Sequence, residues 1–102
     1  MQIAIVRGTV VSTQKIPSLT GVKLLLVQFV NDRGESLGEY EVAADVVGAG
    51  IDEWVLVSRG SSARQESGYE NRPVDALVVG IINTITVQQG LLYSKRNAER
   101  VY

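Results

Sequence analysis

Two acidic residues beside apolar segments are the first candidates for chemistry in this sequence. Asp45 and Asp75 each border a run of apolar residues, and two neighbouring carboxyls can act as acid and base when burial raises the pKa of one. Neither lies in a recognisable motif with a histidine, a lysine or a metal ligand. We therefore expect both side chains to cap turns or to accept backbone hydrogen bonds.

Two residue types that carry much of enzyme chemistry are missing from the chain. The 102 residues include no cysteine, which excludes disulfides, thiolate nucleophiles and thiolate metal sites. They include no histidine, the commonest general base and a frequent metal ligand. We predict a protein with no catalytic residues, no metal site and no cofactor.

The glycine-rich segment Gly48-Ala49-Gly50 begins like a dinucleotide-binding motif. Glu53 stands where the third glycine belongs, and a strand pattern follows instead of a helix, so we reject that function. A tight turn and the lining of a symmetry axis remain as roles for the two glycines. Glu53, Arg59 and Arg64 carry opposite charges that can pair within or between subunits, or remain solvated.

Composition predicts one soluble globular domain. Apolar residues make up 45% of the chain and charged residues 21%, with a net charge of −1 and a pI near 5.3. This charge does not favour nucleic acid, and the six aromatic residues are not interleaved with basic ones. We expect no nucleic-acid partner.

The longest apolar runs are too short to span a membrane. Residues 22–30 are interrupted by Lys23 and Gln28. The first six residues have no basic region before them and end at Arg7 and Gly8, so they indicate a strand rather than a signal peptide. A cytoplasmic protein without membrane contact is expected.

The elements that must position these residues are short strands joined by turns. Strand patterns cover residues 2–13, 22–30, 35–43, 54–57, 74–87 and 91–93. The segment Asn31-Asp32-Arg33-Gly34 has hairpin-turn chemistry, so the strands on either side of it should pair antiparallel. We expect Gly8 at a bulge, and Gly80 at a bend that lets one long strand serve two parts of a curved sheet.

Some of these elements carry more specific expectations. The segment Trp54-Val55-Leu56-Val57 is apolar throughout, so one face should meet the core and the other a further element, for which a second copy is a candidate. In strand 35–43 the apolar residues alternate imperfectly with glutamates, as in a strand with one wet face. Ser61 or Ser62 can begin a short helix over 63–66 that ends at Gly68.

These elements predict a mainly β fold. We expect a small five-stranded barrel, similar to oligonucleotide-binding barrels, with one short helix and a C-terminal β extension. Residues 1–93 would form this single domain. Residues 94–102 would be a tail, either frayed or attached to a neighbour.

Several sequence blocks in a fixed order carry a family resemblance. They are GTVVST at 8–13, LTGVKLLLVQ at 19–28, DVVGAG at 45–50, EWVLV at 53–57, RGSSAR at 59–64, RP at 72–73, DA at 75–76 and VGII at 79–82. With these blocks the chain resembles the CcmL/EutN family of bacterial microcompartment vertex proteins, and within it the members from cyanobacterial carboxysomes.

The resemblance implies a structural role. It implies a homopentamer that occupies the vertices of the carboxysome shell in the cytoplasm, beside hexameric shell proteins. A ring needs an interface in which one surface meets a different surface of the next copy. By analogy with the family, a narrow opening near the five-fold axis would be framed by Gly48, Ala49 and Gly50. Candidates for contacts between neighbouring subunits are Glu53, Trp54, Ser61, Ser62 and Arg64.

The sequence departs from the family at two positions, and other functions stay open. Asp52 stands where many members carry glycine, so a positive backbone angle is either absent there or tolerated by aspartate. Asn83 replaces a common aspartate. The alternatives are a vertex protein of another microcompartment (a metabolosome), a barrel that binds nucleic acid or an anion at the glycine turn, and an enzyme based on Asp45 and Asp75.

Overall fold

The fold comes from a computed structural model, which describes residues 1–60 and 74–97. The predicted helix at 63–66, with Ser61, Ser62 and Arg64, lies outside the described residues. No helix within the described ranges is long and apolar enough to cross a membrane.

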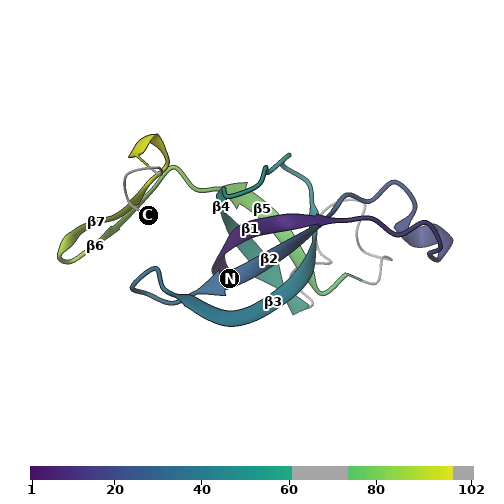
Figure 1. The fold of residues 1–102 in the computed structure, drawn as a ribbon, viewed down its shortest axis with the longest axis horizontal. Coiled ribbons are helices and arrows are strands. Elements are labelled where there is room, and N and C mark those ends of the chain that lie inside the picture. Colours follow the sequence, from purple (N-terminus) through teal and green to yellow (C-terminus); the bar gives the residue numbers. More distant parts are fainter. Residues whose placement is uncertain (61–73, 98–102) are drawn as a thin grey trace.

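Five strands form a closed barrel, and two more form a hairpin that projects from it (Figure 1). The barrel strands are β1 (Gln2–Val10), β2 (Leu24–Val30), β3 (Ser36–Asp45), β4 (Trp54–Arg59) and β5 (Ala76–Ile81). Their order is β1-β2-β3-β5-β4, and β4 pairs again with β1, so the sheet closes on itself. The β3–β5 contact is short and involves only Ala44 and Asp45 of β3. Among the barrel strands that the structure describes, β3 and β5 pair parallel and the other pairs are antiparallel. The prediction of a five-stranded barrel is confirmed.

The remaining elements are short. The projecting hairpin consists of β6 (Thr84–Val87) and β7 (Gly90–Ser94), which confirms the C-terminal β extension. Within the described residues, the 3-10 turns η1 (Pro17–Leu19) and η3 (Lys95–Asn97) follow β1 and β7. Ser94, predicted to begin the tail, is the last residue of β7.

Local chemistry explains the β2–β3 hairpin. The side-chain oxygen Oδ1 of Asn31 accepts hydrogen bonds from the backbone N–H groups of Arg33 (2.9 Å) and Glu35 (3.0 Å). Gly34 has a φ of 78°, which glycine adopts without strain. The predicted antiparallel pairing of these two strands is confirmed.

The two glycines expected to disturb strands have different outcomes. The register of β1 against β2 shifts between Val6 and Gly8, which confirms a bulge there. The prediction of one strand bent at Gly80 is wrong. Gly80 lies inside β5 and pairs with Leu56 of β4, and the chain leaves the barrel only after Ile81. Ile82 ends the barrel pairing by donating its N–H to the carbonyl of Trp54 at 2.8 Å.

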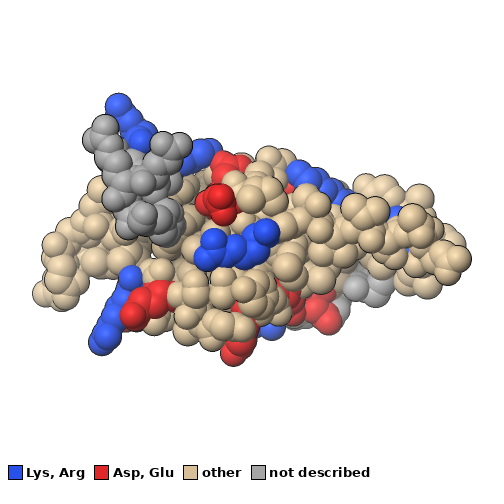
Figure 2. All heavy atoms as spheres, in the orientation of Figure 1, with Lys and Arg blue, Asp and Glu red and all other residues tan. Residues whose placement is uncertain are grey.

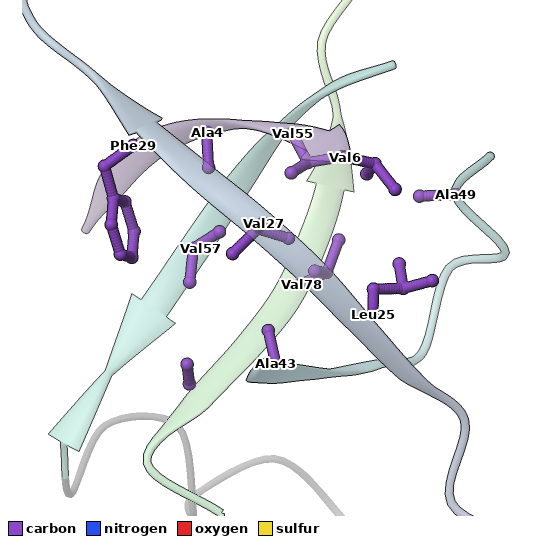
Figure 3. Packing of buried hydrophobic residues seen from close by; sticks show 11 residues of the cluster. Ala4, Val6, Leu25, Val27, Phe29, Ala43, Ala49, Val55, Val57 and Val78 are labelled. Atoms are coloured by element: carbon purple, nitrogen blue, oxygen red, sulfur yellow. The ribbon is translucent and has the colours of Figure 1, made fainter. Parts of the chain in front are cut away.

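Alternate residues of the strands fill the barrel interior. Figure 3 shows side chains of β1, β2, β4 and β5 pointing into one core. Its members are Ala4, Val6, Leu25, Val27, Phe29, Ala43, Ala49, Val55, Val57, Ala76 and Val78. The guanidinium carbon of Arg59 lies 4.9 Å from the ring centroid of Phe29, and Arg59 Nε lies 3.0 Å from Glu41 Oε2. A cation–π contact and an ion pair therefore accompany this apolar core.

The outer side of β1 and β4 is covered by the projecting hairpin. Ile5, Trp54 and Ile82, which we call the covered face, pack with Tyr93 of β7. The rings of Trp54 and Tyr93 stack with centroids 4.4 Å apart and an interplanar angle of 19°, and burial raises the pKa of the Tyr93 phenol. The hairpin of the same chain therefore covers Trp54, whereas Leu56, the other outward residue of this segment, is only partly buried. A second copy over the rest of this strand stays a prediction.

The apolar residues of β3 do not lie on the side that the sequence pattern predicted. Glu41 shares the inner side with Ala43, whereas Tyr40 and Val42 point outward and are 56% and 46% exposed. Leu37 is 48% exposed. A register shift against β2 and a φ of 80° at Gly38 interrupt the strand, so simple alternation does not continue along it.

Candidate functional site

The glycine loop, residues 46–52 between β3 and β4, is fixed by a carboxylate at the end of β3. The side chain of Asp45 has no solvent exposure. It accepts hydrogen bonds from the backbone N–H groups of Val47 (3.0 Å), Gly48 (3.2 Å) and Ala49 (2.9 Å). The prediction that Asp45 accepts backbone hydrogen bonds is confirmed. These charge-assisted bonds impose one conformation on the loop.

A lysine directly before β2 balances the buried charge. The Nζ of Lys23 lies 3.2 Å from Asp45 Oδ2 and donates a hydrogen bond to the carbonyl of Ala49, also at 3.2 Å. The methyl group of Ala49 is 2% exposed and belongs to the barrel core. The middle of the glycine loop is therefore attached to the barrel by an ion pair, a backbone contact and a buried methyl group.

A second carboxylate fixes the other end of the loop. Glu53 Oε1 accepts a hydrogen bond from the N–H of Gly50 at 2.6 Å, and Glu53 Oε2 lies 2.5 Å from Lys95 Nζ. The Lys95 ammonium, followed by the Gly50 N–H, lowers the pKa of Glu53. A Cβ added at Gly50 would lie 3.3 Å from Glu53 Oε1, so this glycine makes room for the carboxylate.

Four consecutive backbone donors of the loop are therefore satisfied within the chain. The N–H groups of residues 47, 48 and 49 bond to Asp45, and that of Gly50 bonds to Glu53. Anion sites in glycine turns depend on free N–H groups that converge on the ligand. The glycine loop does not offer such a set, which argues against the anion-binding alternative.

Backbone angles explain two residues of the loop. Gly48 has a φ of 78° and Asp52 a φ of 69°, and Asp52 is the single non-glycine residue with positive φ among those described. Aspartate tolerates this region better than most residues, so the second of the two expectations for Asp52 holds. Its N–H donates to the carbonyl of Val6 at 2.8 Å, which ties the loop to β1.

The other predicted site residues lie apart from the loop or outside the described ranges. Arg59 pairs with Glu41 rather than with Glu53. Asp75 is exposed, and its carbonyl accepts the N–H of Gly60 at 2.8 Å. Trp54 is 2% exposed beneath Tyr93. Its role in a subunit contact stays a prediction, and its burial leaves little of the side chain for a neighbour to touch. Ser61, Ser62 and Arg64 lie in the segment that the structure leaves undescribed.

Sequence reasoning missed two lysines that shape the site. In the sequence, Lys23 stood out only because it interrupts an apolar run. A charged residue within an apolar run needs a partner when it is buried, so this interruption was a signal for the ion pair with Asp45. Lys95 gave no such signal, because its partner Glu53 lies 42 positions earlier in the chain. Within residues 1–60 and 74–97, no three acidic side chains come together as a metal site would require.

The fold and the glycine loop define a barrel subunit of one family. The model of the family described as "Ethanolamine utilisation protein EutN/carboxysome" matches residues 1–83. The chain belongs to this family.

Named relatives and solved structures are similar over most of the chain. The carboxysome shell vertex protein CcmL of Synechocystis sp. is 64% identical over 100 residues, which are 98% of this chain and 100% of the relative. The structure of CcmL of Nostoc sp. has a TM-score of 0.88 and 70% identity, covering 93% of this chain and 100% of that one. GrpN, a pentameric microcompartment shell protein from Rhodospirillum rubrum, has a TM-score of 0.78 and 46% identity, covering 85% and 99%.

Proposed function

We propose that this chain is a non-catalytic structural subunit of the carboxysome shell. Five copies form a closed ring, and the ring occupies the vertices of the polyhedral shell in the cytoplasm. The observation that carries this proposal is the similarity over nearly the whole chain to a carboxysome shell vertex protein, at 64% identity. The partners are four further copies and, around the ring, the hexameric proteins of the shell facets.

Geometry explains why such a shell needs a five-fold subunit. Six-fold tiles cover a flat sheet and cannot close it, whereas a five-fold tile introduces curvature. A ring of identical chains is built from one repeated contact between two different surfaces. The barrel suits this role because its five strands close into one compact unit that each copy can contribute to the ring.

The glycine loop is proposed to line the five-fold axis. Gly48 and Gly50 are exposed, and internal hydrogen bonds set the backbone around them. Ala49 contributes its main chain only, because its methyl group is buried in the barrel. Among the proposed interface residues, Glu53 retains 22% of its side-chain exposure. Trp54 would act indirectly, by supporting the hairpin.

The second candidate is a vertex protein of a metabolosome. The microcompartment shell vertex protein PduN of Salmonella typhimurium is 52% identical over 84% of this chain. The 64% identity to the carboxysome relative favours the carboxysome. Nucleic-acid binding is less favoured still, because basic and acidic side chains are interspersed on the face shown in Figure 2 and form no basic groove there.

The mass of the purified protein in solution tests the ring. Light scattering behind a sizing column should give about 55.5 kDa, which is five times the 11.1 kDa of one chain. A monomer at every concentration would overturn the ring, and a six-fold mass would move the protein from the vertex to the facet. In cells that lack the chain and any paralogue, shells should be elongated or unclosed, and normal closed shells would contradict the vertex role.

A further inference from the structure

The outer side of β2 and β3 carries apolar side chains that the described segments cover only in part. Leu24 packs against the buried cluster of Ala44, Val74 and Leu77, whereas Tyr40 and Val42 stay exposed. Leu24, Leu26, Tyr40 and Val42, which we call the bare face, lie on the side of the sheet opposite the core. The register shows this, because Leu26 pairs with Val42, whereas the core residue Leu25 pairs with Ala43. Leu24 and Leu26 are half-buried, and Tyr40 and Val42 are the most exposed members.

A groove continues the bare face toward the start of β5. Its volume is about 330 Å³. Its apolar lining comes from Leu19, Leu24, Val42, Ala44, Val74 and Ala76. Glu41 and Asp75 complete the lining, so the apolar bare face continues into a hollow that carries two acidic residues. Contiguous apolar surface of this kind marks an interaction site more often than it marks free protein surface.

We propose that the bare face is one of the two surfaces of the subunit interface, and that its occupant is a second copy of this chain. This inference rests on the proposed ring and names a surface for it. A closed ring requires every chain to offer two different surfaces to its neighbours. The covered face is already occupied by the hairpin of the same chain. Of these two outer apolar faces, the bare face is the one left for a neighbour.

The composition of the bare face fits a protein partner. Its four side chains are uncharged, so it offers no phosphate contacts to a nucleic acid. Tyr40 combines a large apolar ring with a hydroxyl group, a combination that is enriched at protein interfaces. The neighbouring groove also accepts a projecting side chain, as the centres of stable interfaces do.

Ring symmetry makes a single substitution on this face effective. Each of the five contacts would contain one copy of the bare face, so one substitution weakens all five contacts equally. Val42→Glu places a carboxylate where apolar contact is expected, and burying an unpaired charge is strongly unfavourable. We expect the mass to fall from about 55.5 kDa to the 11.1 kDa of one chain.

The matched control is Leu91→Glu on the projecting hairpin. Leu91 is also an exposed aliphatic residue, at 60% exposure, but it belongs to β7 rather than to the barrel (Figure 1). This variant should keep the wild-type mass. Near-ultraviolet circular dichroism of the Trp54–Tyr93 stack should show that both variants are folded. A folded pentamer with Val42→Glu would overturn the assignment to the bare face.

A second measurement decides the question if Val42→Glu does not fold. Because the chain has no cysteine, a single introduced cysteine is the only thiol available to a maleimide probe. In the pentamer, Val42→Cys should react about ten-fold more slowly than Leu91→Cys, because reactivity falls when a thiol is buried. Equal rates in a confirmed pentamer would overturn the inference. A wild-type monomer would instead overturn the ring itself, so the two failures are distinguishable.

Discussion

The covered face and the bare face are outer surfaces of the same barrel, yet only one is protected by its own chain. On the covered face, Trp54 and Ile5 lie under β7 with less than 4% exposure. On the bare face, Tyr40 and Val42 remain about half exposed. Both sets are apolar, so hydrophobicity alone does not separate them. The difference teaches that coverage by the hairpin, and not hydrophobicity, determines which of the two faces is buried within a single chain.

The largest expected difference is between Trp54→Ala and Tyr40→Ala. Removing Trp54 deletes the stack with Tyr93 and leaves a cavity beneath the hairpin, which should cost about 3–5 kcal/mol of unfolding free energy. Removing the exposed Tyr40 should change it by less than about 0.5 kcal/mol. The measurement is chemical denaturation in the Val42→Glu background, where each chain is expected to be monomeric. Equal losses would show that the two faces are not distinct.

A smaller loss of stability is expected at Gly34, in the turn between β2 and β3, which lies against Trp54 and the projecting hairpin. Gly34 has a φ of 78°, and a Cβ added there would lie 3.2 Å from Trp54 Cη2. Gly34→Ala should therefore combine backbone strain of about 1–2 kcal/mol with displacement of Trp54. Gly21→Ala is the matched control, because Gly21 has a φ of 82° and nothing within 4 Å of the added atom. Thermal unfolding should show a larger loss for Gly34→Ala, and equal losses would remove the packing contribution.

The smallest effect concerns the ion pair that ties the glycine loop to the end of the hairpin. The pKa of Glu53 is lowered from 4.5, first by Lys95, so its ionised form is favoured in the folded chain. The resulting stability is present above about pH 4.5 and is lost as the pH falls through the lowered pKa. Because both side chains are partly exposed, we expect less than about 1 kcal/mol.

Thermal unfolding between about pH 7 and pH 3 checks this expectation. Glu53→Gln should be less stable than the wild type at neutral pH, and the two should converge in acid. Lys95→Met removes the other partner of the ion pair. In that background, the stability difference between Glu53 and Glu53→Gln at neutral pH should be smaller. A gap between wild type and Glu53→Gln that stays constant with pH would contradict the assignment.

Local sequence chemistry was sufficient for much of the fold. The turn at Asn31 and Gly34 is stabilised by bonds within five residues, so the sequence contains all that determines it. The carboxylate of Asp45 likewise reaches donors two to four positions ahead. Predictions of this kind need no knowledge of the tertiary structure.

Contacts between distant segments could not be predicted in the same way. The stack of Trp54 with Tyr93 and the pair of Glu53 with Lys95 join segments about 40 positions apart. No local pattern in 91–93 indicated that this short strand covers β4. The outward direction of Tyr40 was missed for a related reason, since the interruption of β3 near Gly38 depends on its pairing with β2.

The carboxylate of Asp45 has a consequence for how a ring would acquire its opening. Since Asp45 and Glu53 hold the glycine loop from within one chain, assembly does not have to order this segment, and association loses less conformational entropy. The width of an opening lined by the loop is then preorganised in the free subunit. Substitutions of residues at the contact between neighbouring subunits would change the protein concentration at which rings form. Substitutions of Asp45 would instead change the shape of the opening.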